Sequence, residues 1–318
     1  MKYSGIGGQA VIEGIMMMKG EDYAVAVRRP DKEIEVKKDT YQSITEKAKI
    51  LQLPFVRGVF RFADSMIIGM RSLTYSASFF EDDEDAEPGK FEQFLDRVFG
   101  EKLESAIMAA VLVISFILAI GIFMLLPLGI ANLFKGVITS DHLMAVLEGV
   151  IRIAIFIIYI KLVSRMEDIR RTFMYHGAEH KCINCVEHGH PLTVKYVRES
   201  SKEHKRCGTS FILIVMVISI LMFMVIRVDT IWMRILSRII LVPVIAGISY
   251  EVLQCAGRSN SKFMDLVSRP GMWMQGLTTK EPDDSMIEVA IAATEAVFDW
   301  REYLTENFPG WEKQLEES

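Results

Sequence analysis

The sequence predicts a mainly α-helical membrane protein with about four transmembrane helices and a cytoplasmic α+β part that contains an N-terminal β-hairpin. The composition supports this prediction, because 51% of the residues are hydrophobic and the mean hydropathy is +0.25. The charged residues, 24% of the chain, gather between apolar runs that are long enough to cross a bilayer. A net charge of −5 argues against a nucleic-acid-binding protein, which would carry a strong basic excess.

Residues 1–80 are expected to form a cytoplasmic β-hairpin followed by an amphipathic helix. Residues 23–28 (YAVAVR) and 33–37 (EIEVK) alternate in character around good turn residues, which is the pattern of a hairpin. The preceding GIGGQAVIEGIMMM is interpreted as a glycine turn and a packed Met-rich segment, since its glycine spacing does not match a phosphate loop. Residues 54–80 carry charges at helical spacing, so this helix either lies on the membrane surface or packs on its own domain.

A four-helix transmembrane region is predicted for residues 91–256, after an acidic linker at residues 81–90 (EDDEDAEPGK). Residues 105–134 form a run of 30 residues without a charge, in which Pro127 would kink or end the helix. Residues 207–226 form a second uncharged run, of 20 residues. Two weaker candidates are residues 143–160, where Glu148 and Arg152 could pair on one helix face, and residues 235–250.

The distribution of basic residues predicts the orientation. Ten Lys and Arg residues lie in residues 161–206, whereas the two short connections hold only one and two. The positive-inside rule then places the His- and Cys-rich loop 161–208 and both termini in the cytoplasm. Residues 257–318 are expected to form a cytoplasmic C-terminal helical segment, in which 257–276 is loop with a short helix and 287–298 is amphipathic helix. We expect this segment to fold with the N-terminal hairpin, because neither buries much core alone.

A polar stretch at residues 175–210, between two apolar runs, is the predicted site. Five of the six histidines and three of the four cysteines lie in it: His176, His180, His188, His190, His204, Cys182, Cys185 and Cys207. Four cysteines in a chain of this length do not make a disulfide framework, so in the cytosol they are expected to be reduced thiols.

His176, Glu179 and His180 form an H-x-x-E-H sequence. On a helix they lie at about 0°, 300° and 40°, so they share one face. In the inverse zinc-protease arrangement two imidazoles bind zinc and the carboxylate between them activates water. The candidates for the third ligand are Glu187, His204, Cys207 and Glu251, and the alternative is a solvated loop that binds no metal. Cys182 and Cys185 would point near 240° and 180°, away from this face, as packed apolar groups.

Six segments carry a family resemblance: GGQAVIEGIMMM, YAVAVRRPD, YHGAEHK, HKRCGTSF, PVIAGISYE and LTTKEPDD. In that order they resemble the YqhQ-like family of bacterial membrane proteins of unknown function, whose members are described as predicted metal-dependent enzymes. The resemblance covers about residues 3–300 and implies that the protein is located in the bacterial cytoplasmic membrane. Where the family often has His-Pro-Arg-Cys, this chain has His204-Lys205-Arg206-Cys207, and Cys182 and Cys185 fall outside the family pattern. The family motifs point to these residues: Glu13, His176, Glu179, His180, Lys181, Asn184, Glu187, His204, Arg206, Cys207 and Glu251.

Three functional hypotheses follow. The first is a membrane-bound metal-dependent hydrolase, with zinc or another divalent transition metal on His176 and His180, Glu179 as base, and a lipid-linked, membrane or peptide substrate. The second is a non-catalytic accessory protein in which the polar cluster is a structural metal site or docks a membrane protein partner. The third, a transporter, ranks last because the two strong spans carry no charges. The sequence does not indicate an oligomeric state.

Overall fold

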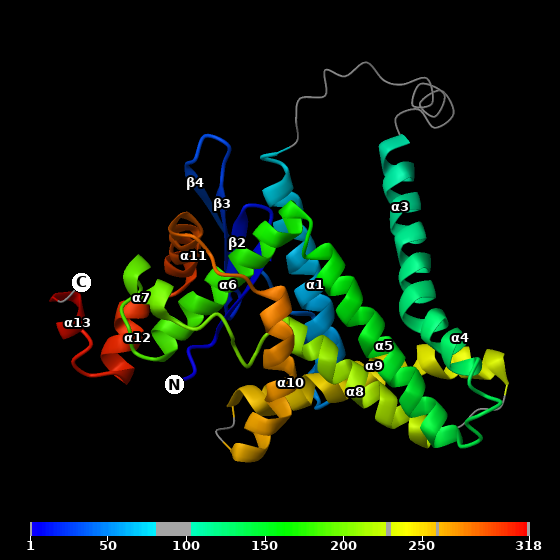
Figure 1. Cartoon of the computed structure of the whole chain (residues 1–318). Coiled ribbons are helices and arrows are strands. Elements are labelled where there is room, and N and C mark those ends of the chain that lie inside the picture. Colours follow the sequence, from blue (N-terminus) through cyan, green and yellow to red (C-terminus); the bar gives the residue numbers. More distant parts are fainter. Residues whose placement is uncertain (1, 81–102, 227–229, 259–260, 317–318) are drawn as a thin grey trace. The chain divides into compact units, whose positions relative to one another are not determined.

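The computed structural model describes residues 2–80, 103–226, 230–258 and 261–316 (Figure 1). The predicted acidic linker at residues 81–90 lies outside the described residues. The chain forms two compact units. The first comprises Met1–Phe80, Ile160–Met222 and Ile226–Ser318, and the second comprises Glu81–Tyr159 and Phe223–Val225.

A four-stranded antiparallel sheet in the order β1-β2-β3-β4 begins the first unit. Its strands are β1 (Ile6–Val11), β2 (Gly14–Lys19), β3 (Asp22–Arg28) and β4 (Ile34–Thr40). The predicted hairpin is confirmed as β3 and β4, which pair with Val25 opposite Lys37. The interpretation of the preceding segment as a glycine turn was wrong, because β1 and β2 form a second hairpin there. Glycine and methionine have little intrinsic strand preference, so it is pairing and burial that make these residues strands.

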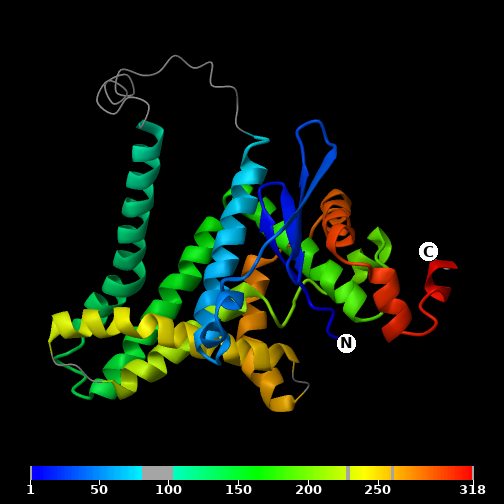
Figure 2. The same ribbon diagram turned by 180° about the vertical axis from the view of Figure 1, so that it is seen from behind.

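The sheet lies between two layers of helices, as Figures 1 and 2 show. On one face pack α6 (Glu167–Glu187) and α11 (Asp284–Val297), and the core there includes Ile15, Met17 and Ala26. On the other face packs α1 (Val56–Ala77), whose Ile68 joins a core with Val25 and Val27. Strand residues thus alternate between the two cores, as a pleated sheet requires. The C-terminal helix and the N-terminal strands share a core, which agrees with the expectation from sequence.

Helix α1 connects the sheet to a helix long and apolar enough to span a membrane, α9 (Ile231–Arg258). The two helices cross closely at Gly58 and Gly247, where a methyl group on Gly58 would come within 3.0 Å of the Gly247 Cα. Beside this crossing the Arg57 guanidinium donates to the Glu251 carboxylate through Nε (2.7 Å) and through Nη2 (2.6 Å). Helix α1 therefore packs both on the sheet and on a span candidate, and a position at the membrane surface stays a prediction.

Four helices of the described residues are long and apolar enough to cross a membrane, which confirms the predicted number. These spans are Val113–Asn132, Asp141–Val163, Gly208–Val225 and Leu236–Gly257. The first comprises the C-terminal part of α3 (Leu103–Ile120), a π-helical turn (Gly121–Leu125) and α4 (Leu126–Asn132). Pro127 lies in the first turn of α4, where a missing N–H costs little. The second span is α5 (Asp141–Val163), and in it Arg152 donates to Glu148 at 2.7 Å, as predicted.

The remaining helices lie within the polar stretch or after it. They are α7 (Val194–Glu199), α8 (Gly208–Val225), α10 (Lys262–Thr278), α12 (Trp300–Asn307) and α13 (Lys313–Glu316). Two short 3-10 turns, Ile44–Lys47 and Lys49–Gln52, precede α1. The prediction of a loop with a short helix at 257–276 was wrong in extent, because α10 is 17 residues long and begins at the capping side chain of Ser261. The helix predicted over residues 287–298 is confirmed as α11, which begins where the Asp283 side chain accepts from the Met286 N–H.

Candidate functional site

Helix α6 provides the frame of the candidate site. Its back face is apolar and packs into the core through Tyr175, Ala178 and Cys182, so its polar residues are held on the opposite side. The helix ends after Glu187, and Gly189 takes the left-handed conformation (φ +87°) that a helix exit favours. Cys182 and Cys185 are fully buried in the core, as the sequence predicted. Burial raises the pKa of Cys182 well above its ordinary value and that of Cys185 to about 12, so both remain neutral thiols.

Three of the predicted site residues come together: His176, His180 and Cys207. One donor atom from each lies within 4.8 Å of the other two. The imidazole centroids of His176 and His180 are 4.4 Å apart, as expected for residues one helical turn apart. The Cys207 Sγ lies 3.2 Å from the His176 Nε2, although 31 residues separate the two in the chain.

The two imidazoles are oriented by backbone carbonyl groups. The His176 Nδ1 lies 3.0 Å from the Thr278 carbonyl oxygen, and the His180 Nδ1 lies 2.7 Å from the Lys202 carbonyl oxygen. A carbonyl oxygen only accepts, so each Nδ1 donates, and in the neutral ring this tautomer leaves the Nε2 lone pair for a metal. Metal-binding histidines are oriented in this way, with the distal nitrogen donating to a carbonyl or carboxylate.

Cys207 is the N-cap of α8, the helix that forms the third span. Its Sγ accepts from the Thr209 backbone N–H at 3.4 Å and contacts the Thr209 hydroxyl at 3.1 Å. The N-terminal end of a helix favours negative charge, so this position suits a thiolate ligand. The side chain is buried, with 5% of its surface exposed.

Lys181 and Asn184 hold the segment that leads to Cys207. The buried Lys181 Nζ donates to the carbonyl oxygens of Arg198 (2.7 Å) and Ser200 (2.9 Å). The Asn184 Nδ2 donates to the carbonyl oxygens of residues 201 (2.7 Å) and 203 (2.9 Å). Residues 198–203 are thereby fixed along α6. The two side chains that the family motifs point to thus position the loop, and neither belongs to the three-donor group.

Glu187, Arg206 and His204 form a second buried cluster at the end of α6. The Glu187 Oε1 accepts from Arg206 Nη2 (2.5 Å), from the Ser4 N–H (2.9 Å) and from the Ser4 hydroxyl (2.8 Å). The Glu187 Oε2 and the His204 Nε2 face each other at 3.6 Å, and both are buried without a hydrogen-bond partner among the described residues. Burial would raise the pKa of Glu187, but His204 and Arg206 outweigh it and hold that pKa at about 2. Burial lowers the pKa of His204 to about 4, so this imidazole is neutral.

The backbone of His204 is fixed by Gln275 of α10, a residue that the sequence analysis did not single out. The Gln275 Oε1 accepts from the His204 N–H at 2.8 Å, and its Nε2 donates to the His204 carbonyl at 2.7 Å. The His180 and His204 ring centroids are 5.7 Å apart, so His204 lies beside the three-donor group without joining it. No local pattern in the sequence marks Gln275, because its role depends on how α10 packs.

Glu179 is buried next to His176 and contacts the sheet. The carboxyl group lies against β1, since a side chain on Gly8 would meet the Glu179 Cγ at 2.9 Å. Burial raises the pKa of Glu179, while His176 and the Gly8 N–H act in the opposite direction. A carboxyl with a raised pKa beside an imidazole is typical of a proton-transfer group.

Glu13 and Glu251 are each engaged in an ion pair away from the three donors. Glu13 has φ +48° in the turn between β1 and β2, and it accepts from Arg171 Nε and Nη2, each at 2.5 Å. The Tyr175 hydroxyl contacts the same carboxylate at 3.3 Å, so Glu13 fixes the turn to α6. Glu251 pairs with Arg57, as described above, and is not among the residues of the three-donor group.

Fold and site together define a class: a helical protein with four membrane-span candidates among the described residues and a largely buried His-His-Cys group where one span begins. The chain belongs to the family of proteins of unknown function DUF1385, whose family model matches residues 53–300. It is 34% identical over 286 residues to the uncharacterized protein YqhQ of Bacillus subtilis (strain 168), covering 90% of this chain and 89% of that protein. No solved structure matches the chain. The resemblance that the sequence motifs indicated is thereby confirmed.

Proposed function

We propose that this protein is a membrane-embedded, metal-dependent hydrolase whose metal ligands are His176, His180 and Cys207. The observation that carries the proposal is their convergence: three donor atoms within 4.8 Å, two of them on imidazoles oriented through Nδ1. Ligand atoms around a tetrahedral zinc lie roughly 3.3–3.6 Å from one another, given bonds of about 2.0–2.3 Å. The 3.2 Å between the Cys207 Sγ and the His176 Nε2 is close to that spacing.

The donor set and its size favour a catalytic site over a structural one. Two imidazoles and a thiolate are ligands typical of zinc, and a related divalent transition metal would also suit them. Structural zinc sites are closed by four protein ligands, whereas catalytic sites use three and leave one position for water or substrate. Among the described residues the group has three members. A metal held there would supply a Lewis acid that activates water for hydrolysis.

Glu179 is the proposed general base. Its burial favours the protonated form, so the carboxylate gains a proton readily when one is released beside it. Glu179 lies against Gly8 of β1, and His176 of the donor group lies one helical turn away from it on α6. His204 and Glu187 lie beside this group as buried residues that position the loop that carries Cys207.

We place the site on the cytoplasmic face of the membrane. The ten basic residues of 161–206 flank it and the positive-inside rule assigns such segments to the cytoplasm. Cys207 begins a helix that is long and apolar enough to span the bilayer, so the site would lie near the interface. A lipid-linked, membrane or peptide substrate fits this position better than a freely soluble one.

Metal content of the full chain purified in detergent tests the proposal. We expect about one zinc or other transition metal per chain in the wild type, and loss of it in the His176→Ala/His180→Ala variant and in Cys207→Ser. His188→Ala is the matched control, because His188 is exposed just after the same helix and should leave the metal in place. A folded wild type that contains no metal and takes up no added zinc would refute the proposal.

A second candidate function uses the pair Cys207 and His176 without a metal. Their 3.2 Å contact, at the start of a helix, is the arrangement of a cysteine nucleophile with its base. Reactive cysteines are usually partly exposed, however, and Cys207 is not, so the buried thiol suits a metal ligand better. Alkylation separates the two: a metal ligand reacts with iodoacetamide only after a chelator removes the metal, whereas a free nucleophile reacts at once.

A further inference from the structure

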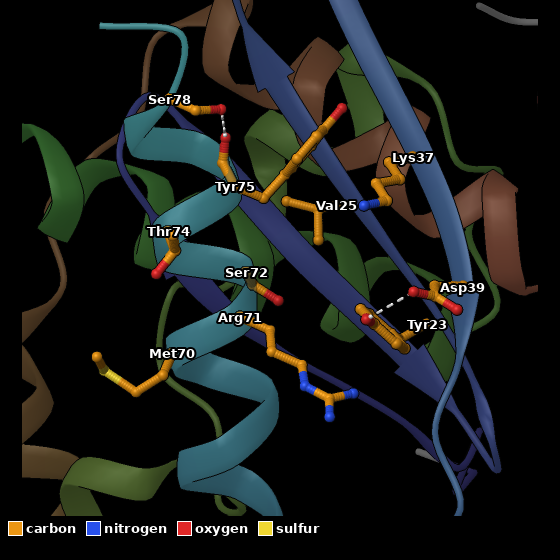
Figure 3. A pocket seen from close by; sticks show the side chains of 10 residues that line it. All are labelled: Tyr23, Val25, Lys37, Asp39, Met70, Arg71, Ser72, Thr74, Tyr75 and Ser78. Carbon is orange, nitrogen blue, oxygen red and sulfur yellow. Dashed lines mark hydrogen bonds between the residues drawn. The ribbon is translucent and has the colours of Figure 1, made fainter. Parts of the chain in front are cut away.

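A groove on the opposite face of the sheet from α6 has no role in the proposed metal site. It lies between α1 and strands β3 and β4, has a volume of about 550 Å³, and we call it the α1–β4 groove (Figure 3). Small-molecule pockets commonly measure roughly 300–1,000 Å³. Helix α1 contacts β1, β2 and β3, whereas β4 is largely exposed. The groove is the space between α1 and the surface of β3 and β4.

Two cations reach into the groove from its two sides. Lys37 comes from β4 and Arg71 from α1, and Figure 3 shows both side chains between the helix and the strands. In the described part of the chain neither of them lies within ion-pair distance of a carboxylate. They contact aromatic rings instead, Lys37 at 4.9 Å from the centroid of Tyr75 and Arg71 at 5.6 Å from that of Tyr41. Asp39 also lines the groove, where it accepts from the Tyr23 hydroxyl at 3.2 Å, so the lining carries a net charge of about +1.

Ser72 adds a buried hydroxyl without a partner. Its side chain is 1% exposed, and its Oγ has no hydrogen-bond partner among the described residues. Serines in a helix normally donate to a carbonyl of the preceding turn, as Ser76 does to Leu73 and Ser78 does to Tyr75 in the same helix. Ser72 instead points into the groove between α1 and the strands (Figure 3). An unsatisfied buried hydroxyl is costly, so this donor is available to a ligand.

We propose that the α1–β4 groove binds the phosphate group of an amphipathic small molecule. The Arg71 guanidinium and the Lys37 ammonium would neutralise the phosphate, and the Ser72 hydroxyl would donate to one of its oxygens. Donors on two opposite walls suit a tetrahedral oxyanion between them, and Arg and Lys are the side chains that proteins use for phosphate. Tyr75, Val25 and Met70 supply the apolar wall for the rest of the molecule.

Two sources of this chemistry fit the structure, a phospholipid headgroup and a soluble phosphate ester. The first half of α1 packs on the membrane-span candidate α9, and the exposed Met66 and Met70 extend an apolar surface from there toward the groove. A lipid could follow this surface with its headgroup directed into the groove. A soluble ester would enter from the side of β4, which is exposed.

Native mass spectrometry of the full chain in detergent tests the proposal, with dioleoyl phosphatidic acid and, separately, glycerol 3-phosphate as probes. Dioleoyl phosphatidylcholine is the reference lipid without a phosphomonoester. We expect Lys37→Met and Arg71→Met each to weaken binding roughly tenfold or more, because each removes a charged hydrogen bond to phosphate. Lys38→Met is the matched control, since Lys38 pairs opposite Ala24 and therefore lies on the other face of the sheet.

Ser72→Ala gives an independent readout. Because the Ser72 Oγ has no partner, its removal should leave the melting temperature of the ligand-free protein unchanged or slightly higher. The same variant should bind phosphatidic acid or glycerol 3-phosphate more weakly. Binding of phosphatidic acid alone identifies a lipid headgroup, and binding of glycerol 3-phosphate identifies a soluble ester. The proposal is overturned if the wild type binds neither probe, or if Lys38→Met weakens binding as much as Lys37→Met.

Discussion

Replacement of Arg206 by methionine should destabilise the protein strongly, because it leaves the carboxylate of Glu187 buried without its cation. The Glu187 side chain is 0% exposed and that of Arg206 is 13% exposed, so water screens this pair little. Methionine keeps an unbranched apolar stem against Gly257 and removes only the charge. The Ser4 N–H and hydroxyl would remain as neutral donors to Glu187.

Two estimates give a similar loss in the free energy of unfolding for this variant. Breaking a buried ion pair by removing one partner typically costs about 3–5 kcal/mol. The pKa of Glu187 lies at about 2 against an ordinary 4.5. This difference corresponds to about 3 kcal/mol of stability at neutral pH, and His204 and Arg206 both contribute to it. For a chain of this size each kcal/mol shifts the melting temperature by roughly 2–4 °C, so we expect a drop of about 6–12 °C.

Tryptophan fluorescence during thermal unfolding of the full chain in detergent measures this shift. Arg198→Met is the matched control, because Arg198 pairs with Asp284 at the surface and both side chains are 55% exposed. An exposed pair contributes at most about 1 kcal/mol, so this variant should melt within roughly 2–4 °C of the wild type. Adding Glu187→Gln to Arg206→Met should recover much of the loss, since the buried charge is then gone. Equal losses in the two Arg variants, or no recovery in the double variant, would refute the reasoning.

Three further predictions use the same unfolding measurement. The lowered pKa of Glu187 implies that the contribution of this carboxylate to stability, fully present above pH 4.5, is lost as the pH drops toward 2, and Glu187→Gln should flatten this part of the profile. Lys181→Met should lower the free energy of unfolding by about 2–4 kcal/mol, because two backbone carbonyl groups lose a charged donor. The zinc affinity of this variant, measured against a chromophoric chelator, should fall roughly tenfold or more. Gly177→Ala should destabilise by about 1–3 kcal/mol, because its methyl group would overlap the Lys280 carbonyl oxygen, whereas Gly276→Ala, with open space around it, should stabilise α10 by up to about 1 kcal/mol. An unchanged melting temperature in Gly177→Ala would contradict the close packing of that segment on α6.

The features that could be predicted from the sequence are those that depend on neighbours in the chain. Helical periodicity places His176 and His180 on one face, and it also places Cys182 on the opposite, buried face. The cap at Asp283 and the pair of Glu148 with Arg152 are likewise set by residues three or four positions apart. The spans follow from length and apolarity alone.

The features that could not be predicted depend on packing between distant segments. The glycines and methionines of β1 and β2 have little strand preference, and the sequence predicted a glycine turn and a packed segment there. They form strands only because they pair with each other and with β3. Gly8 must lack a side chain because a Cβ would overlap the Met16 carbonyl and the Met17 Sδ, each at 2.7 Å. The sequence left four candidates for the third donor beside His176 and His180. Only tertiary structure brings Cys207 next to His176, and it keeps Glu251 with Arg57.

The orientation of each histidine depends on a different segment of the chain, so metal binding at these donors depends on how those segments pack. His176 is held by the carbonyl at the end of α10 and His180 by the carbonyl of Lys202, while Cys207 belongs to the start of α8. The three donors therefore converge only when all three segments are packed on α6. A metal that binds this state and not the unfolded chain would stabilise the packing by about 2.7 kcal/mol at a free concentration one hundred times its Kd. Such a metal would connect α6 to Cys207, the residue that caps a span candidate, so a catalytic role and a structural role need not exclude each other. Zinc should then raise the melting temperature of the wild type and not that of His176→Ala/His180→Ala, whatever reaction the site performs.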